Sequence, residues 1–171
     1  MRLGFGSEAK RGMGSERGGI AVEFAIIFPV LMLLVFGIVD FGHAWYMRHL
    51  MSDASREGAR YGTRYQTVPG DTTKRLLPKD LSPSISNYVL KTGEQNGGNS
   101  GWGLTNLLPP KANPVVTPSG AAATETVGIN LAGEDLNVTV TATKTWFVLG
   151  KLIPGFGDST TLSVTTTMKC E

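Results

Sequence analysis

Few side chains in this sequence are of types that do chemistry, and their spacing argues against an enzyme. The two histidines, His43 and His49, are six residues apart, which places them on different faces of a helix. The single cysteine, Cys170, excludes a disulfide within the chain and a cysteine-rich zinc site. Neither a Gly-x-Ser-x-Gly nucleophile motif nor a phosphate-binding loop occurs. We therefore expect no catalytic residue, no metal site and no cofactor.

One carboxylate stands out by its position. Glu23 is the only charged residue between Ile20 and Val39, a run of twenty otherwise apolar residues. A charge inside an apolar membrane span costs about 2.5–3.5 kcal/mol at the centre and less toward the ends. Two interpretations stay open at this point: the carboxylate reaches the interface, favoured by the helix N-terminus, or it has a role of its own.

The apolar run itself predicts an element that crosses a membrane. Twenty helical residues span about 30 Å, the thickness of a bilayer core, and a chain of this size cannot surround such a helix. The apolar core of a secretory signal is shorter and is followed by small residues. Here Trp45 and Tyr46 follow, and both suit a membrane interface. We predict a retained transmembrane helix over residues 19–42, with the lipid bilayer as its partner.

The charges around the run suggest how it is oriented. The chain has 16 Lys and Arg against 14 Asp and Glu, and this net charge of +2 excludes a strongly basic nucleic-acid-binding protein. The excess lies in residues 1–18, a Gly-rich basic leader expected to have little structure. Since basic residues also follow the run, the positive-inside rule favours a cytoplasmic N-terminus by a small margin. Asp40 is expected at the far interface.

After the run, the apolar pattern continues as a stripe on a helix. Residues recur at intervals of three and four, which predicts an amphipathic continuation of the helix over residues 43–66. Turn residues at 68–71 end it. The stripe consists of Ala44, Met47, Met51, Ala54, Gly58, Tyr61 and Tyr65.

The last fifty residues have the period of a β-strand. Apolar residues alternate with threonine and other polar residues over 136–143, a segment expected to run on through Leu149, and again over 162–168. These two segments predict neighbouring antiparallel strands. The expected fold class is α+β: a long N-terminal helix, half transmembrane and half amphipathic, packed on a small C-terminal antiparallel β-sheet.

The region between the helix and these strands has mixed patterns. A short helix is expected near residues 83–90, and glycine, asparagine and proline predict a mobile loop at about 92–118. Residues 67–171 together are expected to form a periplasmic α+β domain.

Two stretches of the helix resemble a known family. They are Gly-Ile-Ala-Val-Glu-Phe-Ala-Ile-Ile-Phe-Pro-Val-Leu at 19–31 and Arg-Glu-Gly-Ala-Arg-Tyr-Gly at 56–62. Together with the basic leader, they resemble the TadE-like pseudopilins of the tight-adherence (Flp pilus) system. The resemblance covers residues 17–63, and the C-terminal strands match the family only loosely.

The resemblance implies roles for Gly18, Gly19, Glu23 and Phe24, and the chemistry of proline suggests one for Pro29. A prepilin peptidase is expected to cleave between Gly18 and Gly19 at the cytoplasmic membrane face. Glu23, followed by the aromatic Phe24, then becomes the assembly carboxylate that pairs with the freed amine of a neighbouring subunit. Pairing with the new amine of Gly19 in the same chain stays open. Pro29 removes one helix hydrogen bond and permits a kink, or is simply tolerated.

The function implied is that of a minor pseudopilin in the assembly of a type IV (Flp) pilus. Its partners are the prepilin peptidase, other pilins or pseudopilins and the pilus assembly platform. It is expected in the bacterial inner membrane as a single-pass protein with a cytoplasmic N-terminus, and in a pilus if it enters the filament. The alternative is an unprocessed single-pass membrane protein whose extracytoplasmic β-domain binds a partner or a surface ligand.

Overall fold

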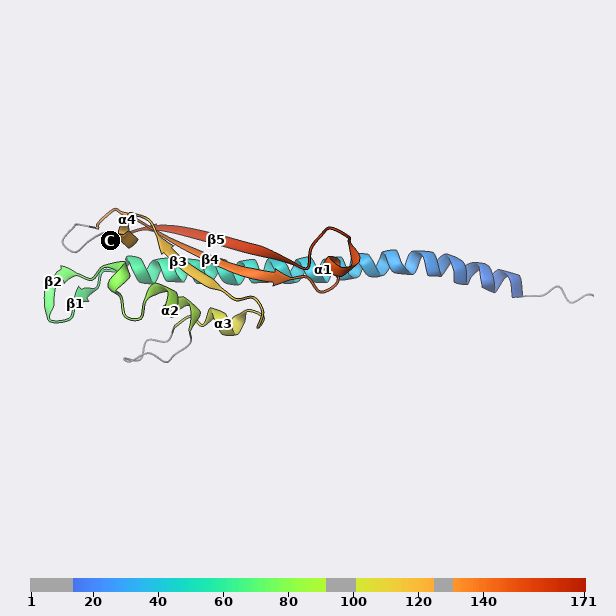
Figure 1. Ribbon diagram of the computed structural model, residues 1–171, viewed down its shortest axis with the longest axis horizontal. Helices are drawn as coiled ribbons and strands as arrows, with labels where there is room; N and C mark the ends of the chain where they lie inside the picture. The colour runs from blue at the N-terminus through green and yellow to red at the C-terminus, as the bar shows by residue number, and fades with distance from the viewer. Residues whose placement is uncertain (1–13, 92–100, 125–130) are drawn as a thin grey trace, which may run out of the picture.

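The chain is organised around one long helix, α1, from Gly14 to Thr63. The computed structural model describes residues 14–91, 101–124 and 131–171. At 1.5 Å per residue, the 50 residues of α1 span about 75 Å. The other elements lie along its C-terminal half, and its N-terminal half projects beyond them (Figure 1). The predicted helix, continuous from the apolar run into the amphipathic stripe, is confirmed.

A three-stranded antiparallel sheet lies on this helix, with its strands in the order β3-β4-β5. The strands are β3 (Val115–Ser119), β4 (Asp135–Thr145) and β5 (Ser159–Lys169). β4 and β5 pair along their whole length, from Asp135 opposite Lys169 to Thr145 opposite Ser159. The predicted antiparallel pair is therefore confirmed, and so is the α+β class.

The alternation of β4 explains why this sheet covers the helix. Its residues are alternately buried and partly exposed, because successive side chains of a strand point to opposite faces. The inward-facing side chains meet α1 and are fully or almost fully buried. They are Leu136, Val138, Val140, Ala142 and, at the end, Lys144.

The helix supplies the other side of the core. Met47, Met51 and Ala54 have no exposed surface, as the predicted stripe requires. Gly58 lets the elements approach closely, because a Cβ there would lie 2.6 Å from Cγ2 of Val89. The predicted stripe extends one position too far, since α1 ends at Thr63 and the Tyr65 side chain is exposed.

Aromatic residues close the core at the C-terminal end of α1. The rings of Tyr61 and Tyr88 stack with centroids 4.1 Å apart, and the Tyr61 hydroxyl donates to the carbonyl of Pro83 at 2.9 Å. The Tyr88 hydroxyl donates to Glu57 at 3.2 Å. Burial, and secondly the Glu57 carboxylate, raise the pKa of Tyr88.

Short elements fill the rest of the domain. A two-stranded hairpin, β1 (Thr67–Val68) and β2 (Asp71–Arg75), follows α1. The predicted short helix is present as α2, and its N-cap Ser84 accepts from the backbone N–H of Asn87. The other short helices are η1 (Pro78–Asp80), α2 (Ile85–Leu90), α3 (Leu104–Leu107), α4 (Ala121–Thr124) and α5 (Leu149–Leu152).

The expectation of a loop at 92–118 needs correction. Residues 92–100 lie outside the described residues, but the rest of the segment contains α3 and most of β3. Val116 is buried in the core, which holds β3 against β4. Pro118 is compatible with this strand because β3 is at the edge of the sheet, where a missing N–H is tolerated. The prolines of this segment led us to predict a loop where β3 forms.

Candidate functional site: the exposed half of α1 and its junction with the domain

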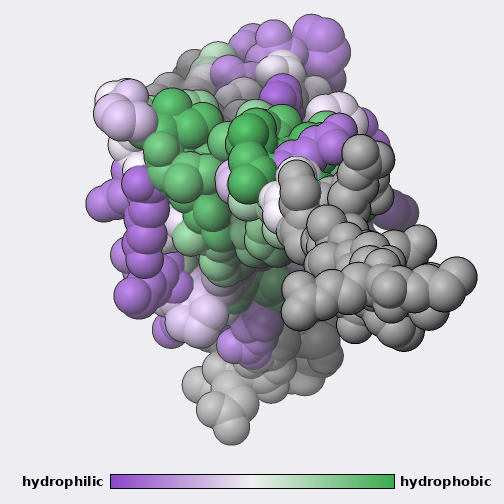
Figure 2. Space-filling view, turned by 90° about the vertical axis from the view of Figure 1, so that its right-hand side faces the viewer, coloured by the Kyte–Doolittle hydropathy of each residue, from purple (hydrophilic) through white to green (hydrophobic). Residues whose placement is uncertain are grey.

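The N-terminal half of α1 has no covering layer in the described chain. We call residues 20–39 the exposed half and residues 44–63 the packed half. The exposed half carries fourteen large apolar side chains, each between 40% and 68% exposed. By length and composition this helix is able to cross a membrane, and none of its most apolar stretch is buried. Viewed from the N-terminal end of α1, the molecule shows apolar surface in the middle and hydrophilic residues around it (Figure 2).

The predicted processing site lies near the start of α1. Gly18 and Gly19 are both helical, and a Cβ added at either would meet no atom within 4 Å. The expectation that the leader has little structure is wrong for its last residues, because α1 already begins at Gly14. Each glycine weakens a helix by about 1 kcal/mol relative to alanine, so two in succession make this part of α1 easy to unwind. An open, weakly helical segment is suited to entering a peptidase.

The predicted assembly carboxylate is exposed on the same helix. Within the described part of the chain, the ion pairs use Asp40, Asp71 and Asp135, and Glu23 is exposed without a partner. The neighbouring Phe24 contacts the ring of Phe28, with centroids 5.4 Å apart. A single chain therefore offers Glu23 to a partner outside the described residues.

Pro29 lies inside α1, and the helix continues through it. Because proline has no N–H, it leaves one carbonyl of the preceding turn without its helical donor. The predicted kink at this position stays a prediction.

The exposed half ends at a buried ion pair that the sequence did not predict. Asp40 has no exposed surface, and its Oδ1 lies 3.4 Å from Nζ of Lys144. The same carboxylate accepts the backbone N–H groups of Phe147 at 2.9 Å and of Val148 and Leu149 at 3.1 Å each. Asp40 is therefore buried in the protein and not open to solvent, and its expected level at the far membrane interface stays a prediction. Four partners offset the desolvation of the carboxylate.

These contacts also explain why β4 ends where it does. The predicted strand continued to Leu149, but β4 stops at Thr145 and the chain turns into α5. Trp146 still donates its N–H to the carbonyl of Asp158 at 2.9 Å, but Asp40 accepts the next three N–H groups, so these do not pair with β5. Lys144 lies 4.5 Å from the ring centroid of Phe147 and 5.0 Å from that of Trp146. We call this arrangement of Asp40, Lys144 and residues 146–149 the junction.

A signal for the junction was present in the sequence. Lys144 continues the inward-facing register of Leu136, Val138, Val140 and Ala142. A lysine at a core position of a strand needs a buried acceptor. The acceptor is 104 residues away in the chain, so periodicity alone did not identify it.

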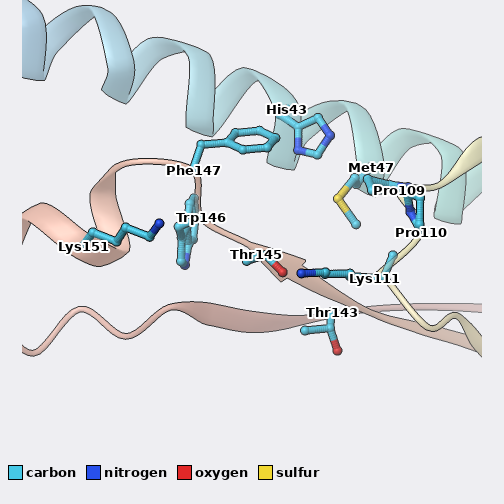
Figure 3. A pocket seen from close by; sticks show the side chains of 11 residues that line it. His43, Met47, Pro109, Pro110, Lys111, Thr143, Thr145, Trp146, Phe147 and Lys151 are labelled. Atoms are coloured by element: carbon cyan, nitrogen blue, oxygen red, sulfur yellow. The ribbon is translucent and has the colours of Figure 1, made fainter.

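A hollow of about 430 Å³ opens beside the junction (Figure 3). Its walls are mostly apolar, formed by His43 and Met47 from α1 and by Trp146 and Phe147. Two lysines flank it: Lys111 and Lys151 lie on opposite sides, with their amino groups directed toward each other. The remaining lining residues are Pro109, Pro110, Ala112, Thr143 and Thr145. The hollow combines an apolar wall with two cations and has no carboxylate in its lining.

The described residues offer little for catalysis. They contain no group of three or more His, Cys, Asp or Glu side chains placed to hold a metal ion. Cys170 is buried, and burial raises the pKa of its thiol, which disfavours the nucleophilic thiolate.

A comparison with known protein families finds a similarity in α1. The family described as TadE-like protein matches residues 18–60. Residues 18–60 of α1 are therefore similar to this family. The match begins at Gly18, covers the whole exposed half and Asp40, and takes in about a quarter of the chain. No curated protein and no solved structure matches the chain. The β-sheet domain lies outside the match.

Proposed function

We propose that this protein is a TadE-like minor pseudopilin that takes part in the assembly of a tight-adherence (Flp) pilus. One observation carries the proposal: the TadE-like helix leaves its apolar half uncovered beside a folded domain. In this proposal the exposed half lies in the bacterial inner membrane, with the N-terminus cytoplasmic and the domain periplasmic. Its partners are other pilins or pseudopilins and the pilus assembly platform.

The size of the uncovered surface supports an apolar environment. Fully burying one large apolar side chain stabilises by about 1.5–3 kcal/mol. Because these fourteen side chains are each about half exposed, they represent at least about 10 kcal/mol of unfavourable exposure in water. A bilayer removes this penalty first, and the helices of neighbouring subunits can replace the lipid during assembly.

The charge of Glu23 favours transfer of the helix from the bilayer to a partner subunit. Its carboxylate is exposed within the apolar surface, where a charge is unfavourable in lipid. Cleavage between Gly18 and Gly19 would create a positive amine, and two opposite charges attract strongly where water is scarce. We propose that Glu23 pairs with such an amine during assembly.

Intact-mass spectrometry tests the processing step. The full chain is expressed with and without a prepilin peptidase and extracted from membranes. We expect loss of residues 1–18 only with the peptidase, and we expect Gly18→Val to block it. Gly37→Val is the matched control, because a side chain there also meets no atom within 4 Å. A full-length wild-type chain in peptidase-competent cells would support the unprocessed single-pass protein instead.

The assembly role of Glu23 needs a separate readout. We expect Glu23→Gln to leave cleavage intact and to abolish co-purification with pilus subunits. Asp53→Asn, which removes a charge from an exposed position of the packed half, should leave both unchanged. Normal assembly of the Glu23 variant would contradict the proposed charge pairing.

A further inference from the structure

The chain between β4 and β5 exposes apolar side chains at one end of the domain. We call residues 146–158 the junction loop. Phe147 is 57% exposed, Leu152 51%, Phe156 41% and Ile153 38%. Large apolar side chains grouped on a loop are unusual on a surface that faces water only.

The junction fixes where this loop lies along α1. Asp40, which directly follows the exposed half, binds the backbone N–H groups of Phe147, Val148 and Leu149. The ring of Phe41 lies 5.7 Å from that of Trp146. The loop therefore sits at the end of the domain from which the exposed half emerges (Figure 1). Wherever the exposed half enters a bilayer, the junction loop is at the border.

The hollow beside the loop adds charge at the same level. Lys111 and Lys151 face each other across it, and both are exposed. Two cations with no carboxylate between them favour an anion. Long lysine side chains can hold their charge at the headgroups while their stems cover apolar surface.

We propose that this end of the domain docks on the phospholipid interface. Leu152, Ile153 and Phe156 enter the upper part of the acyl chains, and Lys111 and Lys151 contact lipid phosphates. The inference rests on the proposed function in one respect, namely that α1 spans a membrane. It adds a second contact with lipid, made by the domain itself.

A phospholipid surface fits better than a second copy of the chain. A neighbouring copy at the same level would present Asp40, which is already buried in its own junction, and a single exposed carboxylate, Asp158, at the last residue of the junction loop. Its next helix carboxylate on the N-terminal side, Glu23, is 17 residues away, or about 25 Å along the helix. A bilayer presents acyl chains and phosphates side by side, which matches the apolar loop and the two lysines together.

Fluorescence quenching in nanodiscs that hold one copy of the full chain tests the proposal. Cys170 is replaced by alanine, and an environment-sensitive dye is attached after Leu152→Cys, Leu34→Cys or Thr167→Cys. Leu34 lies in the exposed half, and Thr167 is exposed at the far end of β5. Spin labels are placed on the lipids near the headgroups or deep in the acyl chains. We expect deep quenching at 34, shallow quenching at 152 and none at 167.

Each outcome decides a different claim. Quenching at 34 without quenching at 152 overturns the docked loop and leaves the anchor standing. Absence of quenching at 34 overturns the membrane span of the proposed function, while position 152 still decides the loop. Shielding of 152 only when two copies share a nanodisc identifies a neighbouring subunit as the occupant and overturns the proposal, and so does quenching at all three positions.

The lysines are tested in the same system. With anionic phosphatidylglycerol in the nanodisc, we expect stronger shallow quenching at 152 than with phosphatidylcholine alone. Lys111→Gln with Lys151→Gln should remove this difference, and Lys79→Gln, at an exposed lysine of η1, should preserve it. A difference that survives the double substitution would overturn the assignment of these lysines to lipid phosphates.

Discussion

The two halves of α1 have nearly the same length and opposite surroundings. In the packed half Met47 and Met51 have no exposed surface, whereas in the exposed half Leu34 is 56% exposed. The packed half has an apolar stripe and charged residues off it, while the exposed half is apolar all round except for Glu23. A helix with one apolar stripe is completed by one sheet, but a helix apolar on every side needs lipid or several other helices.

A buried, charged residue, Asp40, lies at the boundary between these halves. Asp40 is the first residue after the apolar run, and it attaches the helix to the sheet through Lys144 and the start of α5. The domain is therefore held at a fixed position along the helix. A rigid attachment lets any movement of the exposed half carry the domain with it.

Removing this attachment has the largest expected effect. Asp40→Ala leaves Lys144 buried without its carboxylate and frees three N–H groups, and breaking a buried pair costs about 3–5 kcal/mol. We expect the free energy of unfolding of the domain to fall by about that amount. Urea unfolding of the full chain in detergent micelles measures it. Asp53→Ala, at an exposed position of the packed half, should change stability by less than about 0.5 kcal/mol. Equal losses in both variants would refute the role of the junction.

Two glycines distinguish the packed half of α1 from the segment just before it, with effects of opposite sign. Gly58→Ala places a methyl group 2.6 Å from Cγ2 of Val89, and overpacking costs about 1–3 kcal/mol. Gly42→Ala meets no atom within 4 Å, so the better helix propensity of alanine stabilises by up to about 1 kcal/mol. The same unfolding measurement compares the two. If both variants were stabilised, the close packing of α1 on α2 would be disproved.

The sequence predicted those parts of the fold that follow from a local period. The apolar run and the stripe predicted α1, and the alternation of threonine with valine and leucine predicted the pairing of β4 with β5. The strand β3 was missed because Pro118 looks like a breaker unless the strand is known to lie at an edge.

The residues of the candidate site also differ in whether a local sequence pattern could predict them. Gly18 and Glu23 were found because they stand within a few residues of each other at the start of the apolar run. The junction was missed because a carboxylate on a helix and a lysine on a strand become partners only through the tertiary fold. An inward-facing Lys144 was the one local sign of it.

The smallest expected effect concerns the end of the domain farthest from the exposed half. Cys170 is 4% exposed, and its backbone N–H donates to Glu134 while its carbonyl accepts from Gly133. Desolvation by burial raises the pKa of this thiol, so its neutral form persists as the pH rises toward 9. The stability linked to the neutral thiol is complete below the ordinary thiol pKa and is lost as the pH rises through the higher folded value.

We therefore expect slow alkylation of Cys170. At pH 8 the native chain should react with iodoacetamide at least about tenfold more slowly than the urea-unfolded chain, because both burial and the raised pKa suppress the thiolate. Glu171→Cys in a Cys170→Ala background is the matched control, since residue 171 is exposed and one position further along. If Cys170 reacted as fast as this control, the C-terminal end of the sheet would be frayed. The domain would then be firmly packed near the junction and loosely packed at the end that contains Cys170.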